Sequence, residues 1–98
     1  MTDVATIRDV SQFAEQLGNV FRIEVGADEY VDATLAEAEA HSARAGGENA
    51  GTSFSLLFTL PDELTLEQRI YRITQEEMGE MMIFLVPVGA GKMESVFN

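Results

Sequence analysis

The residues with the most suggestive spacing for ligand chemistry are Gly89, Gly91 and Lys92, which belong to a Gly-Ala-Gly-Lys sequence. Phosphate-binding loops end in this way, because their backbone amides and a lysine surround the phosphate groups. The full motif also requires glycine at position 86 and serine or threonine at position 93, where this chain has Val86 and Met93. The motif must also lead into a helix, whereas the residues that follow have a strand pattern. We therefore predict a hairpin turn here.

The candidates for a base and a nucleophile are His41, the only histidine, and the serines Ser53 and Ser55. His41 begins a segment, residues 41–51, that is rich in Gly, Ala, Ser and Asn, a composition that predicts a mobile surface loop. Metal sites need several converging ligands, and a catalytic triad needs an oriented base. Neither serine has an evident base, so the sequence predicts no nucleophilic catalysis.

Two groups of carboxylates fall at expected turns: Asp28, Glu29 and Asp32, and then Glu76, Glu77 and Glu80. Carboxylate oxygens can bind divalent cations, but neither group follows the spacing of a calcium-binding loop. Paired carboxylates can also hydrolyse glycosides, although only a structure gives the separation that this reaction needs. Charged turns are normally solvated. We expect no catalytic residue, no cofactor and no metal site.

The composition limits the classes of partner. The chain has 98 residues, with 17 acidic and 6 basic side chains and a formal net charge of -11. This charge disfavours nucleic acid and anionic membrane surfaces, because non-specific binding to phosphates requires Lys and Arg. Without cysteine, the chain can form neither disulfides nor thiolate metal sites. We expect one soluble domain over residues 1–98, without membrane insertion, located in the cytoplasm by default or in an assembled particle.

A short helix is expected near the N-terminus, over residues 10–17. Four apolar residues there have helical spacing: Val10, Phe13, Ala14 and Leu17. Asp9 is a suitable N-cap, and Gly18 is a suitable residue to end the helix. The apolar face of this helix must pack against another element.

The rest of the chain has strand patterns. Alternating apolar residues or dense apolar runs predict strands at residues 20–26, 30–38, 54–60, 69–75, 81–88 and 93–97. The end of the second strand is ambiguous, because residues 33–45 are rich in alanine and glutamate, which favour helix. Short strands without helical crossovers indicate a mainly β fold, a small antiparallel β-barrel or sandwich of about six strands with one short N-terminal helix.

The strand at residues 81–88 is apolar at nearly every position, which predicts that protein covers both of its faces. Its two rows of side chains cannot share one interior, and the sequence does not say which row is inside. We take one outward set as a candidate interface: Leu57, Met82, Phe84 and Val86. The helix and loops of the same chain could cover this face instead. Pro87 lacks an amide hydrogen, so we expect a bulge, a strand end or an unpaired edge there.

Six segments stand out, in chain order: DVSQFAEQLGNVFRI, FSLLF, IYRI, MG, FLVPVG and ESVFN. Together they resemble a family of small bacterial domains described only as a domain of unknown function. They cover nearly the whole chain, but their shared positions are core residues and turn glycines, so the resemblance transfers no catalytic residue. Similar genes often lie near phage-tail-like collar or fibre genes, and the resemblance therefore implies a structural role.

These observations favour a non-catalytic structural or protein-interaction β-module, which assembles with itself or with a protein partner, in a phage-tail-like or other oligomeric particle. The alternative is a small-ligand-binding β-barrel, which would require an internal cavity in place of a filled core. An enzyme is the least favoured class, because no constellation of nucleophile, base and metal is visible.

Overall fold

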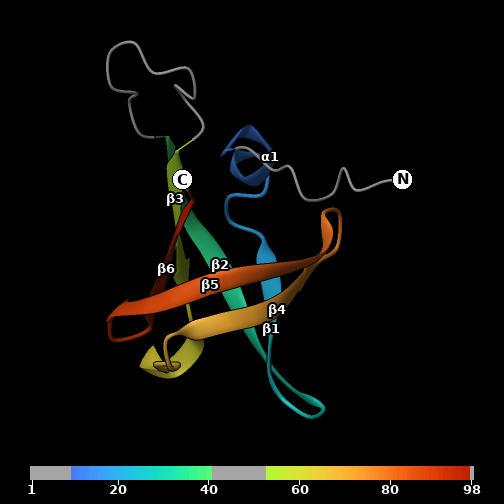
Figure 1. The fold of residues 1–98 in the computed structure, drawn as a ribbon, viewed down its shortest axis with the longest axis vertical. Helices are drawn as coiled ribbons and strands as arrows, with labels where there is room; N and C mark the ends of the chain where they lie inside the picture. The colour runs from blue at the N-terminus through green and yellow to red at the C-terminus, as the bar shows by residue number, and fades with distance from the viewer. Residues whose placement is uncertain (1–9, 41–52, 98) are drawn as a thin grey trace.

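The computed structural model describes residues 10–40 and 53–97, so Asp9, His41 and the loop predicted at residues 41–51 lie outside the described residues. Figure 1 shows the elements in chain order: α1 (Val10–Ala14), β1 (Val20–Gly26), β2 (Glu29–Ala40), β3 (Phe54–Thr59), the 3-10 turn η2 (Pro61–Glu63), β4 (Arg69–Gln75), β5 (Gly79–Gly89) and β6 (Lys92–Phe97). The predicted strands are all present and differ from the observed ones only at their ends.

The strands form a closed barrel in the order β1-β2-β3-β6-β5-β4. Every pair of neighbours in this order is antiparallel. The prediction of a mainly β antiparallel fold with one short helix is confirmed, and the structure selects the barrel over the sandwich. In Figure 1 the β4–β5 hairpin runs across the other strands.

One row of side chains from each strand fills the barrel interior. In β5 this row is Met81, Ile83 and Leu85, which are all buried, whereas Met82 and Phe84 point outward and are exposed. The other strands contribute Phe21, Ile23, Ala33, Leu35, Phe54, Leu56, Phe58, Tyr71, Ile73 and Met93. The sequence did not show which row of β5 side chains faces inward. The structure settles this, because the barrel interior has room for only one of the two rows.

The helix is shorter than predicted: α1 ends at Ala14, and Leu17 is exposed. After Glu15 the chain continues with i→i−3 bonds in place of α-helical ones, from Gln16 N to the carbonyl of Phe13 at 2.8 Å and from Leu17 N to that of Ala14 at 3.2 Å. Gly18 N then donates to the carbonyl of Leu35 at 2.9 Å and Leu35 N donates to that of Asn19 at 3.1 Å, so the chain joins β2 there. The helix thus buries Phe13 and not the whole predicted stripe. No helix in residues 10–40 or 53–97 is long and apolar enough to span a membrane.

Phe13 closes one end of the barrel with an aromatic cluster. Its ring centroid lies 6.4 Å from that of Phe21, 5.8 Å from that of Phe54 and 5.7 Å from that of Phe97. The Phe54 and Phe97 rings stack on each other at 4.5 Å. The helix therefore contacts β1, β3 and β6 through one side chain.

Strand β2 continues to Ala40, although its second half is rich in alanine and glutamate. Pairing with β3 explains this, because residues 37–40 of β2 each have a partner on β3. A register shift between Leu35 and Glu37 leaves Ala36 unpaired as a bulge. The ladder hydrogen bonds outweigh the helix propensity, as the strand prediction assumed.

The prediction for Pro87 is confirmed. The β5–β6 register shifts between Pro87 and Gly89, and the β4–β5 ladder ends at Leu85. Pro87 therefore lies beside a bulge and beyond the end of β4, where a missing amide hydrogen breaks no regular ladder.

The turn between β5 and β6 contacts η2 closely at Gly91, which has φ +71°. Leu60 N donates to the carbonyl of Gly91 at 2.8 Å. A Cβ atom on Gly91 would lie 2.9 Å from the Cα of Glu63, whereas a Cβ on Gly18, which has φ +86°, would meet nothing within 4 Å. Glycine is therefore needed at position 91 for both conformation and space.

We expect Gly91→Ala to lower the free energy of unfolding by about 3 kcal/mol, because left-handed strain and a backbone overlap add together. The matched control is Gly18→Ala, which introduces only the strain and should cost about 1 kcal/mol. Urea denaturation followed by circular dichroism measures both. Equal losses in the two variants would show that the contact with Glu63 is unimportant.

Candidate functional site

The candidate interface residues lie on the outer surface of the barrel. Met82 is 63% exposed and Phe84 is 45% exposed, whereas Leu57 and Val86 are half-buried. Phe84 is opposite Ile70 of β4, which is 56% exposed. We call the resulting apolar surface the outer β5 strip, and it consists of Ile70, Met82, Phe84, Val86 and Val88.

Leu57 does not join this strip directly. It is opposite Glu94 of β6, and Glu94 is in turn opposite Val86. A carboxylate-bearing residue therefore stands between Leu57 and the strip. The structure brings Met82, Phe84 and Val86 together on one strand and adds Ile70 and Val88, which the sequence analysis did not select.

Arg72, which lies beside the strip, forms ion pairs with two carboxylates. Arg72, opposite Met82, has its Nη1 atom 3.1 Å from Oε2 of Glu80 and its Nε atom 3.7 Å from Oε1 of Glu24. These side chains are more than a third exposed, so each pair contributes less than about 1 kcal/mol to stability. These pairs matter here because Arg72 neutralises Glu80, which is the only charged residue of β5.

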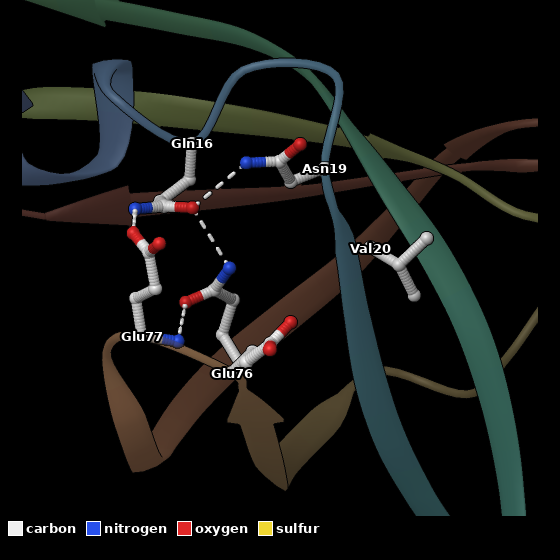
Figure 2. A pocket seen from close by; sticks show the side chains of 6 residues that line it. Gln16, Asn19, Val20, Glu76 and Glu77 are labelled. Carbon is white, nitrogen blue, oxygen red and sulfur yellow. Dashed lines mark hydrogen bonds between the residues drawn. The ribbon is translucent and has the colours of Figure 1, made fainter.

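A second candidate is a surface cleft of about 310 Å³ between the α1–β1 connection and the β4–β5 turn. Figure 2 shows the side chains that line it: Gln16, Asn19, Val20, Gln75, Glu76 and Glu77. Gln16 and Gln75 are both 4% exposed. The sequence analysis missed both glutamines. The signal for Gln75 was its place in the inward row of β4, after Tyr71 and Ile73.

Hydrogen bonds join the two buried amides to each other and to the turn. Oε1 of Gln75 accepts from the backbone N–H groups of Glu77 at 2.7 Å and Met78 at 2.8 Å. Oε1 of Gln16 accepts from Nε2 of Gln75 at 2.8 Å and Nδ2 of Asn19 at 2.9 Å, and Nε2 of Gln16 donates to Glu77 at 2.9 Å (Figure 2). Amides neither titrate nor attack substrates, so this amide cluster positions the turn.

The two serines and the Gly-Ala-Gly-Lys sequence, which were considered for chemistry, have structural positions. Ser53 donates its hydroxyl hydrogen to the carbonyl of Phe97 at 3.3 Å, and Ser55 lies buried on β3. Gly91 lies in the hairpin between β5 and β6, where Gly89 is opposite Lys92, so the predicted turn is confirmed.

The two clusters of acidic residues noted in the sequence do not converge, because their side chains are spread along the hairpins. Oδ1 of Asp32 lies 3.2 Å from Nε of Arg22, while Glu77 and Glu80 bind Gln16 and Arg72 respectively. Within the part of the chain that the structure describes, no three histidine, aspartate or glutamate side chains converge to hold a metal ion.

The pKa of the Tyr71 hydroxyl lies above its ordinary value. Burial raises the pKa of its hydroxyl, the guanidinium of Arg69 acts in the opposite direction, and Glu67 raises it further. The hydroxyl also donates to the carbonyl of Glu67 at 2.6 Å. It therefore remains protonated at neutral pH and serves as a hydrogen-bond donor within the fold.

We expect Gln75→Met to destabilise the domain by about 2–4 kcal/mol, since it leaves buried donors of the turn without an acceptor. The control is Gln68→Met, at an exposed position, which should change stability by less than about 0.5 kcal/mol. Thermal denaturation measures both variants. If they melt together, the amide cluster does not hold the turn.

Comparison with curated proteins and with solved structures finds no significant match to the chain. A family model described as a domain of unknown function, DUF6916, matches residues 9–97. This match covers all the described strands and confirms the resemblance noted in the sequence. The chain therefore belongs to the DUF6916 family of domains of unknown function.

Proposed function

We propose that this domain is a non-catalytic protein-interaction module that assembles through the outer β5 strip. The observation that carries the proposal is the exposure of Met82 and Phe84 on a strand whose other row already fills the barrel. The helix and the described loops leave these two side chains uncovered. An exposed apolar surface of this kind typically marks a protein contact.

The packing of the barrel interior also favours a protein-interaction module over a barrel that binds a small ligand. Large side chains from α1 and from the strands are fully buried in one cluster, including Phe13, Phe21, Phe54 and Phe58. The cleft beside Gln16 and Gln75 lies at the surface and is lined mainly by polar groups. A small-ligand-binding barrel would instead use an apolar internal cavity, so the alternative function gains no support from this arrangement.

We propose that the domain is a component of an oligomeric, phage-tail-like particle. The support for this setting is the resemblance to domains whose genes lie near collar or fibre genes, together with an apolar surface suited to permanent contacts. A repeated small module needs such a surface, because assembly into a particle depends on contacts between copies or with a neighbouring subunit.

Substitution on the two faces of β5 tests the proposal. Light scattering over a concentration series should give wild-type masses above the 10.7 kDa of one chain. Phe84→Glu should stay folded by circular dichroism and return the mass to the monomer, because a partner would desolvate the new charge. Ile83→Glu should unfold the domain, since burying an unpaired carboxylate costs at least about 4 kcal/mol.

Val20→Glu is the matched control. Val20 is 51% exposed but lies on β1, away from the strip. This variant should keep both the fold and the wild-type mass. A wild type that stays monomeric at about 1 mM would overturn the proposed function.

A further inference from the structure

The outward side chains of β2, β3 and β6 form a surface that the outer β5 strip leaves out. Cross-strand pairing places two neighbouring rows here: Glu37, Leu57 and Glu94 in one, and Glu39, Ser55 and Val96 in the next. These side chains point outward, because the alternate residues of β3 fill the barrel interior. We call this surface, made of these two rows, the acidic face.

The three carboxylates of the acidic face have no counter-ion among the residues that the structure describes. The ion pairs there involve Glu24, Asp32 and Glu80 instead. The described arginines lie on β1 and β4. Lys92 is on β6 but at the end of the face, opposite Thr59. The acidic face is therefore complementary in charge to a basic partner.

Ser55 gives a second, independent indication that this face receives a ligand. It belongs to the outward row of β3, yet it is only 9% exposed. Its hydroxyl has no hydrogen-bond partner within the described structure, unlike that of Ser53, which donates to the carbonyl of Phe97. A buried hydroxyl without a partner is unfavourable. A backbone group of a bound segment would satisfy it.

We propose that the acidic face binds an extended segment of a partner protein in which lysine or arginine recurs at every second position. This inference goes beyond the proposed function, because it uses a different surface. Glu37 and Glu39 are two residues apart on one strand, so their Cα atoms lie about 6.6 Å apart. Alternate side chains of an extended segment have the same repeat, so successive cations reach successive carboxylates.

The rest of the acidic face suits the other parts of such a segment. The aliphatic stems of lysine and arginine pack along apolar surface while their charged ends stay in water. These stems would cover Leu57, which is half-buried, and Val96, which is 53% exposed. The main chain of the segment would bond to the Ser55 hydroxyl.

Calorimetric titration with the peptide acetyl-Lys-Thr-Lys-Thr-Lys-Thr-Lys-amide tests the proposal. The titration uses about 0.1 M salt, where the screening length is about 10 Å and distant charges contribute little. Replacing the three carboxylates of the acidic face together by glutamine should weaken binding about tenfold, since three exposed ion pairs are lost.

The control variant has the same net charge. It carries glutamine in place of Glu15, Glu67 and Glu76, which are exposed and lie outside β2, β3 and β6. This variant should bind the peptide within about twofold of the wild type, because its carboxylates lie away from the face. Equal losses in the two variants would overturn the proposal, since they would show that only the overall charge attracts the peptide.

Ser55→Ala separates recognition of a peptide from attraction of any cation. It should weaken peptide binding about threefold, because one hydrogen bond is lost, and leave the binding of spermine, a polyamine of the same charge, unchanged. The melting temperature of the free variant should not fall, since the hydroxyl has no partner to lose. A lower melting temperature, or a peptide that binds no more tightly than spermine, would overturn the proposal. These measurements do not depend on whether copies assemble through the outer β5 strip.

Discussion

The limited interior of the six-stranded barrel is the constraint on which the rest of the structure depends. A small barrel encloses one row of side chains from each strand. In β5, Met81, Ile83 and Leu85 occupy that space together with the aromatic cluster around Phe13. The second apolar row has no room inside. Met82 and Phe84 must therefore lie outside, and the outer β5 strip follows from the closure of the barrel.

The sequence predicts the strands well because their patterns depend on local alternation. The apolar residues of β1 and β4 and the dense apolar run of β5 mark their own positions, and Pro87 marks the point where regular pairing stops. These features act within one strand or one turn. For the same reason β2 could be predicted despite its alanines, since a hairpin return supplies the backbone partners that it needs.

The parts that the sequence could not predict depend on contacts between distant residues. Both rows of β5 are apolar, so only the closed barrel shows which row is inside. The helix was predicted to continue to Leu17, but it gives way to i→i−3 turns from Gln16, and the chain then bonds to β2 at Gly18 and Asn19. The buried pair Gln16 and Gln75 is 59 residues apart in the chain. No local pattern reveals that two amides satisfy each other across such a separation.

The amide cluster also links the closed end of the barrel to the start of β5. Gln75 fixes the backbone of Glu77 and Met78, immediately before β5 begins at Gly79. Gln16 fixes that same turn against the segment that follows Phe13. The start of β5 is thus positioned by the segment that follows the helix, since its pairing with β6 begins only at Val86. The outer β5 strip is carried on a strand whose turn is fixed by hydrogen bonds, and order that exists before binding lowers the entropic cost of a contact.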